Sequence, residues 1–373
     1  AFAKQKIKSA DLKFYDAPED QLGYIDSLNF QVDHASASYS QFNQQEDQIW
    51  LHLNKPLKPG QTIRIETPFR VKIPVNFSRM GYSGESFQIS QWYPKPAVYD
   101  ATGWNLMPYL DQGEFYSEFG SFDVEIRVPE NYLVAATGSL ETESEKEWLA
   151  QRVEWSDKYI KSGSEPRTVI TRDSSKMKTL RYRAENVHDF AWFADPHFLV
   201  QHRRQTLENG KDIDVWAMFR NPAVWSEAAS SVARSVEFFS REIGPYPWPQ
   251  ATAVEGELLA GGGMEYPMIT IIGSMSGKTE LDNVIAHEVC HNWFYGILGS
   301  NERRHPYMDE GLTSYYENRY MLHYYGATAF DWFENPLERI TGPVHLGKLL
   351  YLLSARTYSD QYPNQSAERF TSF

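Results

Sequence analysis

The spacing of apolar residues changes near residue 200 of this 373-residue chain. Before that point, short runs of alternating apolar and polar residues are separated by Gly, Pro, Asn and Asp, which is typical of β-strands joined by turns. The clearest runs are residues 49–54, 62–75, 121–129, 168–172 and 179–184. The pattern therefore predicts an all-β region over residues 1–199.

Further along, apolar residues recur at the three- and four-residue steps of a helix. They are Trp225, Ala228, Val232, Val236, Phe239 and Ile243. Asn221 suits the N-cap of this helix and Gly244 suits its end. Residues 268–273 predict a strand, and a second helix is predicted from about Thr279 into the mid-290s. We therefore expect residues 200–373 to form a mixed α/β region.

Charge and cysteine content exclude several classes of protein. The net charge of −13 opposes nucleic-acid binding, because that affinity depends on Lys and Arg neutralising phosphates. The single cysteine, Cys290, excludes an intramolecular disulfide framework and a zinc site built from several thiolates. The highly charged run ETESEKEW at 141–148 is predicted to be a solvated loop or sheet edge.

Targeting signals do not identify a compartment. No run approaches the roughly 18 consecutive apolar residues of a membrane span, and the first residues lack the apolar core of a signal peptide. We expect a soluble protein without a transmembrane segment, in either an exported or periplasmic or a cytoplasmic location. The sequence does not indicate the oligomeric state.

Candidate chemistry is concentrated in IAHEVCHNWFYG at 285–296. On a helix, His287 and His291 project from one face, where both imidazoles can reach one ion at about 2.0–2.1 Å. Glu288 lies beside them and can take a proton from water as it attacks a carbonyl, while zinc polarises that carbonyl. Taken alone, the motif also allows two histidines that hold no metal.

A third ligand follows on the next predicted helix. Glu310 comes after eighteen intervening residues beyond His291. A carboxylate from a second helix would complete a three-ligand zinc site and leave the fourth position for water or substrate. One zinc ion per chain, held by His287, His291 and Glu310, is therefore predicted. Glu317 lies on the side of this helix that could support a ligating histidine, although a solvent-facing role is equally open.

The order His287, Glu288, His291, Glu310 resembles that of gluzincin peptidases. Upstream of it, GGGMEYP at 261–267 resembles the exopeptidase motif G-x-M-E-N of the M1 family of zinc aminopeptidases. Further stretches similar to bacterial M1 proteins, in the family's order, are residues 92–138, 189–196 and 238–249. The resemblance implies a β-rich N-terminal domain over 1–199 and a thermolysin-like α/β catalytic domain over 200–373, the latter incomplete at its C-terminus.

The resemblance also implies a binding site for the substrate amine. Glu265 is expected to pair with the α-ammonium group of a peptide, and Tyr266 stands where the family usually has Asn. The rest of the predicted amine-binding loop is Gly262, Gly263 and Met264. Family members place a Gln or Glu of the β domain near the same amine, for which Gln88 and Gln91 are candidates.

The expected function is a zinc-dependent aminopeptidase that removes residues from peptides with free N-termini. In this reading a metal-activated water attacks the first peptide bond and Glu288 is the general base. Two alternatives remain open: a thermolysin-like zinc endopeptidase, and a non-catalytic M1-like protein that uses its cleft for protein interaction. The side-chain preference at the first substrate position is not predicted.

One expected element is missing from the sequence pattern. M1 enzymes use a tyrosine about sixty or more residues after the third zinc ligand to donate a hydrogen bond to the oxyanion. Tyr351, Tyr358 and Tyr362 lack the spacing and the following residues of that tyrosine. The resemblance therefore implies that this chain stops before the catalytic tyrosine, and that by itself it would bind zinc weakly or not at all and be nearly inactive.

Overall fold

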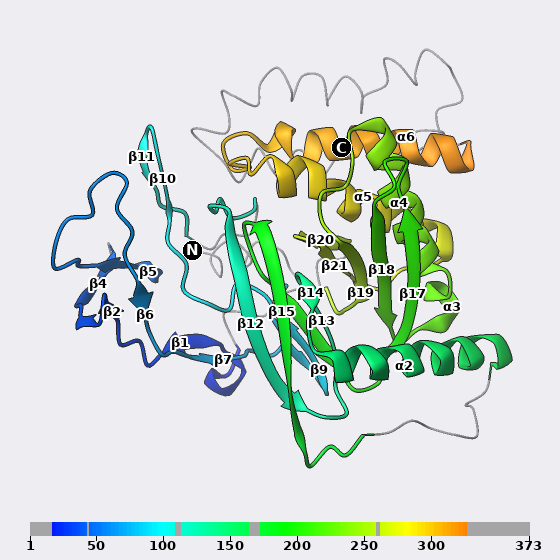
Figure 1. The fold of residues 1–373 in the computed structure, drawn as a ribbon, viewed down its shortest axis with the longest axis horizontal. Coiled ribbons are helices and arrows are strands. Elements are labelled where there is room, and N and C mark those ends of the chain that lie inside the picture. Colours follow the sequence, from blue (N-terminus) through cyan, green and yellow to red (C-terminus); the bar gives the residue numbers. More distant parts are fainter. Residues whose placement is uncertain (1–16, 43–44, 109–112, 164–171, 259–261, 327–373) are drawn as a thin grey trace.

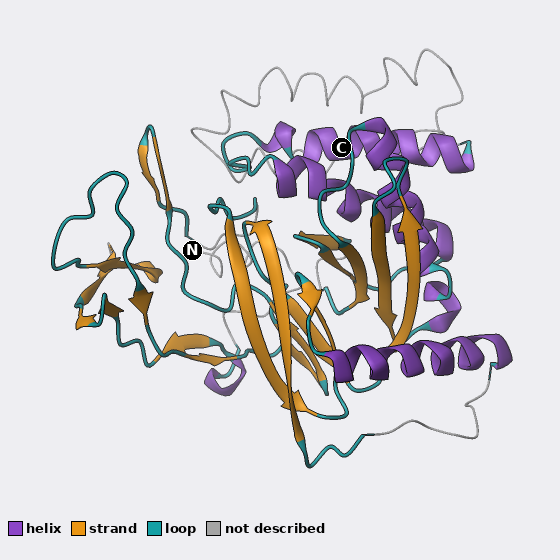
Figure 2. Cartoon of the chain, viewed as in Figure 1, coloured by secondary structure: helices purple, strands orange, loops and turns teal. Residues whose placement is uncertain are grey.

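The structure, a computed structural model, describes residues 17–42, 45–108, 113–163, 172–258 and 262–326. A β-rich first part is followed by a part in which helices pack on a sheet, as Figures 1 and 2 show. This order confirms the predicted fold class. Within the described ranges, no helix is both long and apolar enough to cross a membrane.

Two antiparallel sheets form the core of the first part, with strand orders β12-β15-β14 and β13-β16-β9-β8. Their strands are β8 (Gly81–Ser83), β9 (Ser86–Ile89), β12 (Gly120–Pro129), β13 (Leu133–Ala136), β14 (Ser139–Leu140), β15 (Met177–Val187) and β16 (Trp192–Asp195). Ile126, Leu180 and Tyr182 are buried against Val134 and Phe190, so alternate residues of β12 and β15 enter one core. The alternation predicted these two strands correctly because one face of each is buried.

Smaller pairings precede these sheets. The strands are β1 (Tyr24–Asp26), β2 (Gln31–Val32), β3 (Ala35–Ser36), β4 (Tyr39–Phe42), β5 (Gln45–Leu51), β6 (Ile65–Glu66), β7 (Arg70–Lys72), β10 (Val98–Asp100) and β11 (Gly103–Asn105). They pair as β1-β7, β3-β2-β6, β4-β5 and β10-β11. A short 3₁₀ turn, Glu19–Gln21, precedes β1. The predicted strand at 168–172 lies, except for residue 172, outside the described residues.

The prediction of a solvated loop at 141–148 is wrong. These residues lead into α2 (Glu143–Ser162), a 20-residue helix inserted between β14 and β15. Trp148 and Leu149 are buried in a core shared with the second part of the chain. Burial of this helix face outweighs the charge of the run, which the local composition alone does not reveal.

A buried carboxylate fixes α2 to β15. Glu145 is 2% exposed and accepts hydrogen bonds from Arg172 at 2.7 Å and from Lys178 at 2.5 Å. Both cations lie 4.2 Å from the Trp148 ring centroid. The partners are 27 and 33 residues from Glu145 in sequence. The charged run is therefore explained by tertiary ion pairs and cation–π contacts.

The second part contains a five-stranded sheet with the order β17-β18-β19-β21-β20. Its strands are β17 (Leu199–Thr206), β18 (Asp212–Phe219), β19 (Gln250–Glu255), β20 (Gly263–Tyr266) and β21 (Ile269–Ile272). β18, β19 and β21 are parallel, and the edge strands β17 and β20 run antiparallel to their neighbours. The strand predicted at 268–273 is β21.

Each face of this sheet is covered by a different part of the molecule. Val215 and Ala253 pack with residues of the helices, including Val236 and Ile285. On the opposite face, Met218 and Ile271 pack with α2 and with strands of the first part. The helices are α3 (Pro222–Trp225), α4 (Ala228–Glu242), α5 (Lys278–His291) and α6 (Glu310–Tyr325). The sheet is thus a middle layer between the β-rich part and the helices.

The helix predicted after residue 221 is present but broken. Asn221 accepts a hydrogen bond from the Ala223 amide at 3.2 Å, as expected of an N-cap, and α3 then ends at Trp225. Glu227 has a φ of −120°, and the Ser226 carbonyl accepts a hydrogen bond from a β17 side chain at 2.7 Å. This tertiary contact divides the predicted helix into α3 and α4.

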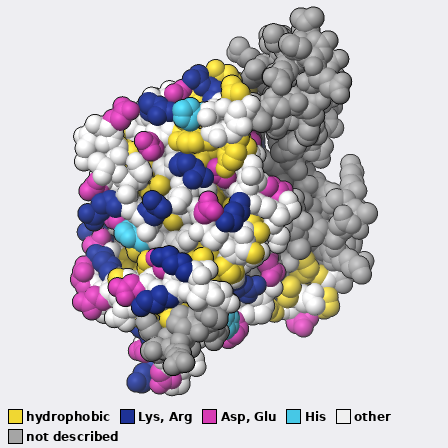
Figure 3. All heavy atoms as spheres, turned by 90° about the vertical axis from the view of Figure 1, so that its right-hand side faces the viewer, with side chains coloured by type: hydrophobic (Ala, Val, Ile, Leu, Met, Phe, Trp, Pro, Cys, Tyr) yellow, Lys and Arg dark blue, Asp and Glu magenta, His cyan; other side chains and the backbone are white. Residues whose placement is uncertain are grey.

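The second predicted helix is confirmed with one irregularity. α5 ends at His291 and continues directly as a π-helical segment, Asn292–Ile297. A 3₁₀ turn, Pro306–Met308, then precedes α6. On the face shown in Figure 3, Lys and Arg side chains are interspersed with Asp and Glu, so that face has no single sign of charge.

Replacing Glu145 should destabilise the fold. In Glu145→Ala, Lys178 and Arg172 lose their buried partner, and we expect the free energy of unfolding to fall by about 3–5 kcal/mol. Denaturant unfolding followed by circular dichroism measures this change. Glu143→Ala is the matched control, since its side chain is 77% exposed and a surface pair with Lys146 contributes under about 1 kcal/mol. Equal losses in the two variants would contradict the assignment.

Candidate active site

Two neighbouring helices bring the predicted metal ligands together. His287 and His291 lie near the end of α5, and Glu310 is the first residue of α6. The two Nε2 atoms are 3.1 Å apart, and Glu310 Oε2 lies 3.3 Å from His287 Nε2 and 3.8 Å from His291 Nε2. Ligands at about 2.0–2.1 Å from a tetrahedral zinc ion are about 3.4 Å from each other. The three atoms therefore fit the ligand set of one zinc ion.

Hydrogen bonds at the Nδ1 atoms of both histidines fix the two rings, whose Nε2 atoms face each other. His287 Nδ1 lies 2.8 Å from Glu317 Oε2, and His291 Nδ1 lies 2.6 Å from Asp309 Oδ1. Thr313 Oγ1 is 3.3 Å from the latter nitrogen. A proton shared with a carboxylate at Nδ1 leaves the Nε2 lone pair free to bind a metal.

Of these supporting residues, sequence reasoning found one and missed another. Glu317, left open between support and solvent exposure, contacts His287 and is 15% exposed. Asp309 is fully buried and was not considered. Its position directly before the predicted ligand Glu310 was the available signal.

The protonation states of two ligands suit metal binding. Burial lowers the pKa of His291 to about 3, so its ring is neutral at pH 7. Burial acts to raise the pKa of Glu310, but its hydrogen bond with His287 and the nearby imidazoles lower it to about 2. Glu310 is therefore ionised.

His287 shows that this position favours a positive charge. Burial lowers the pKa of His287, but its bonds to Glu310 and Glu317 outweigh burial and raise that pKa well above its usual value. Two carboxylates around one imidazole thus favour a positive charge on or beside the ring. A divalent metal on the Nε2 side would supply it.

The proposed base, Glu288, lies in a dry environment beside strand β20. It is 5% exposed, and its Oε2 atom has no hydrogen-bond partner among the described residues. Burial, together with the charges of Glu310 and Glu317, raises the pKa of Glu288 to about 8. A buried, unpartnered carboxylate oxygen is a site for a water molecule or a substrate atom.

Glycine at 263 is required by the close approach of Glu288. A Cβ atom at Gly263 would lie 2.6 Å from the Cγ, Cδ and Oε1 atoms of Glu288. Gly262 has a φ of +70°, which favours glycine, but a Cβ there would meet nothing within 4 Å. Gly263 therefore positions the carboxylate of Glu288, a role that differs from the predicted contact with a substrate amine.

Successive residues of β20 point to opposite faces of the sheet. Glu265 is 7% exposed, and its Oε1 lies 3.9 Å from His291 Nδ1. Met264 and Tyr266 are buried in the core that includes Phe193. The Met264 side chain therefore lies away from Glu265, and the Tyr266 departure from the family pattern alters the face opposite the metal ligands.

The environment of Glu265 is strongly acidic. Burial, followed by the negative charges of Glu114 and Glu288, raises the pKa of Glu265 well above its usual value. A cation placed beside this carboxylate would relieve both effects. The site thus has a second position, separate from the metal ligands, that favours positive charge.

The hydrogen bonds of the two glutamine candidates go to groups other than Glu265. The Gln88 side-chain amide is engaged with backbone: it donates to Arg79 O at 3.0 Å and accepts from the Glu257 amide at 2.6 Å. Gln91 donates to the Tyr266 hydroxyl at 3.4 Å, on the far side of β20. Tyr351, Tyr358 and Tyr362 lie outside the described residues.

A further ionic group next to the site was missed by sequence reasoning. Arg79 donates a hydrogen bond to Glu114, and Glu302 accepts one from the Glu114 amide. Burial, together with the charge of Glu114, raises the pKa of Glu302 to about 8. Because Glu114 and Glu302 are 188 residues apart, no local pattern could have paired them.

Comparison with known proteins agrees with this geometry. The model of the Peptidase family M1 domain matches residues 227–341, which include the histidines, Glu288 and Glu310. This stretch of the chain is similar to the M1 peptidase domain. This match confirms the family resemblance of the sequence.

Curated relatives match over about a third of the chain. Leucine aminopeptidase 2 of Sclerotinia sclerotiorum is 30% identical over 113 residues, which cover 30% of this chain and 18% of that protein. Aminopeptidase B of Mus musculus is 28% identical over 129 residues, which cover 33% of this chain and 19% of that protein. The matched stretch thus spans less than a fifth of either relative.

Solved M1 structures share the fold over nearly the whole chain. An M1 zinc metallopeptidase from Deinococcus radiodurans aligns with a TM-score of 0.57 and 16% identity, covering 93% of this chain and 79% of that one. A variant of it bound to a Tyr-Ser-Ala substrate gives a TM-score of 0.57 at 14% identity, covering 94% and 83%. Aminopeptidase A of Legionella pneumophila aligns with a TM-score of 0.54 and 13% identity. The alignment covers 84% of this chain and 35% of that one.

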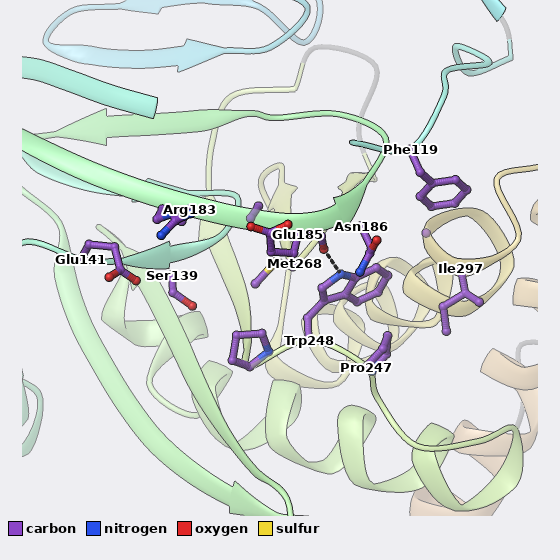
Figure 4. Close-up of a pocket in the computed structure, with 13 residues that line it drawn as sticks. Phe119, Ser139, Glu141, Arg183, Glu185, Asn186, Pro247, Trp248, Met268 and Ile297 are labelled. Atoms are coloured by element: carbon purple, nitrogen blue, oxygen red, sulfur yellow. Dashed lines mark hydrogen bonds between the residues drawn. The ribbon is translucent and has the colours of Figure 1, made fainter. Parts of the chain in front are cut away.

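A cavity of about 650 Å³ lies apart from the M1 motif residues. Figure 4 shows Trp248 in its middle, with Phe119 and Ile297 toward one end and Ser139 and Glu141 toward the other. Its lining contains none of the predicted ligands, the base or Glu265.

Removing the carboxylate behind His287 should weaken zinc binding. Supporting partners of metal-ligating histidines typically contribute 10- to 100-fold in metal affinity, so Glu317→Ala should raise the zinc dissociation constant by about 10-fold or more. Competition with a chromogenic chelator measures it. Glu280→Ala, which removes an exposed carboxylate at the start of α5, should leave the constant unchanged. Unchanged affinity in Glu317→Ala would refute the supporting role.

Proposed function

We propose that this chain carries the zinc site of an aminopeptidase that hydrolyses the first peptide bond of peptides with free N-termini. The observation that supports it best is the meeting of three features in one buried place. They are the triangle of ligand atoms, the unpartnered oxygen of Glu288 and the acidic position of Glu265. The names of the M1 relatives, which include aminopeptidases, support the same proposal.

In this proposal His287, His291 and Glu310 hold one zinc ion. Zinc bound there would polarise the substrate carbonyl and lower the pKa of a water molecule. Asp309 and Glu317 keep the imidazole rings in place and hold the protons on Nδ1. The protein thus supplies a neutral histidine, an ionised carboxylate and fixed ring orientations before any substrate binds.

Glu288 acts as the general base. A pKa near the working pH suits a group that accepts a proton from the attacking water and then returns it to the leaving amine. Burial and the neighbouring carboxylates raise the pKa of Glu288 to about 8, and a cation bound beside it would lower that pKa so that the carboxylate is ionised near pH 7. Gly263 lets the side chain lie against the backbone of β20, which restricts the directions that its carboxylate can take.

Glu265 receives the α-ammonium group of the substrate. The carboxylate is buried, lies among other acids and is 3.9 Å from the ring of a metal ligand. An ammonium group held there by charge-assisted hydrogen bonds would place the adjoining peptide bond near Glu288. A peptide with a blocked N-terminus lacks that charge, which explains exopeptidase selectivity.

Two variants should disable the base without removing the metal. In the full-length protein, Glu288→Gln should lower kcat by about 10²- to 10⁴-fold, the usual contribution of general base catalysis, and retain zinc. Gly263→Ala should produce a similar loss because the new methyl group displaces the Glu288 side chain. Turnover of an aminoacyl-amide substrate and zinc content by emission spectroscopy measure both effects.

Gly120→Ala is the matched control for the glycine variant. Gly120 lies at the start of β12 without a left-handed φ, and a Cβ there would meet nothing within 4 Å, so turnover should change little. Loss of zinc in Glu288→Gln would show that Glu288 is a ligand and contradict its assignment as base. Full activity of that variant would refute the proposed mechanism.

The preference for free N-termini should depend on Glu265. We expect Glu265→Ala to reduce the ratio of kcat/KM for a free peptide over its acetylated form by roughly 10- to 150-fold, equivalent to about 1.5–3 kcal/mol. Glu257→Ala, which removes a side chain 46% exposed on the preceding segment, should keep the ratio. If the unmodified protein cleaves both peptides equally, it is an endopeptidase. If it cleaves neither while holding zinc, the site is non-catalytic.

A further inference from the structure

Three consecutive residues of the β-rich part are held by residues that lie between the zinc ligands in sequence. Arg303 donates to the Gly113 carbonyl from Nε at 3.2 Å and from Nη2 at 3.1 Å. Glu302 accepts a hydrogen bond from the Glu114 amide. The Tyr295 hydroxyl donates to the Phe115 carbonyl at 3.0 Å. We call these three residues, Gly113 to Phe115, the 113–115 segment.

The contact is buried and closely fitted. Arg303 is 4% exposed, and its third donor, Nη1, reaches the Pro108 carbonyl at 2.7 Å. Its guanidinium carbon lies 5.5 Å from the centroid of the Phe115 ring. Gly113 has a φ of +80°, and a Cβ there would lie 2.8 Å from Arg303 Cγ. Only glycine meets both requirements, the left-handed backbone and the close approach of the arginine.

The residues that bind this segment lie in the connection between α5, which carries the two histidines, and α6, which begins at Glu310. Tyr295 lies in the π-helical segment that follows His291 directly. Glu302 and Arg303 lie in the turn that leads to Asp309 and Glu310. The 113–115 segment therefore bridges the end of α5 and the start of α6.

We propose that the 113–115 segment is a positioning element of the metal centre. It fixes the connection between α5 and α6. Glu310 and Asp309, which supports His291, are thereby held at the correct distance from the two histidines. The β-rich part is then a component of the zinc site as well as a cover for the sheet. This inference rests on the proposed zinc site, and Arg303 and Gly113 are positioning residues that act through Asp309 and Glu310.

Variants on both sides of the contact test it in the full-length protein. Arg303→Ala removes the donors, and Gly113→Ala places a methyl group against the Arg303 side chain. We expect each to raise the zinc dissociation constant by about 10-fold, read by chelator competition, and to change the visible absorption spectrum of the cobalt(II)-substituted protein. Arg304→Ala is the matched control, since Arg304 is exposed in the same turn and should leave both readouts unchanged.

Arg303→Lys provides a second test in case the alanine variant does not fold. Lysine keeps the charge but has no planar fork, so zinc affinity should fall between those of Arg303→Ala and the parent. Parent-like zinc affinity and cobalt spectra in folded Arg303→Lys and Gly113→Ala would overturn the inference and leave the proposed zinc site standing. A parent that binds no zinc would overturn the proposed function and this inference together.

Discussion

The structure depends on the meeting of two imidazoles and one carboxylate between α5 and α6. Their three ligand atoms lie 3.1–3.8 Å apart within a buried place that also contains Glu265, Glu288 and Asp309. Collecting carboxylates away from water costs several kcal/mol per charge unless cations compensate them. In the proposed function, a metal ion on the Nε2 side and a substrate ammonium group at Glu265 would supply those cations.

The need to compensate these buried carboxylates accounts for a site that combines residues of the helices, of the sheet and of the β-rich part. The helices provide the proposed ligands and the proposed base, while edge strand β20 supplies Glu265 on the face that looks toward them. Arg79, from the β-rich part, pairs with Glu114 and lowers the pKa values of Glu288 and Glu310 as a lesser contribution. The five-stranded sheet, which lies between the β-rich part and the helices, supports these groups because both of its faces are packed.

Sequence reasoning succeeded where the decisive interactions are local. The spacing of His287 and His291, and the alternation in β12 and β15, follow from helix and strand periods within a few residues. It failed where partners are distant: α2 was mistaken for a loop because Glu145 is paired with cations 27 and 33 residues away. The pairing of Glu302 with the Glu114 amide spans 188 residues, and no single-sequence pattern carries that information.

Two glycines show how the same residue type serves different physical needs. At Gly263 the backbone is extended within β20, so glycine is needed for space, since a methyl group would occupy the position of the Glu288 carboxylate. At Gly113 both a positive φ and the approach of Arg303 require it. A glycine-rich motif therefore does not by itself indicate flexibility or substrate contact. In this protein, each of these glycines lets a charged side chain lie directly against backbone, and that contact fixes where the charge is presented.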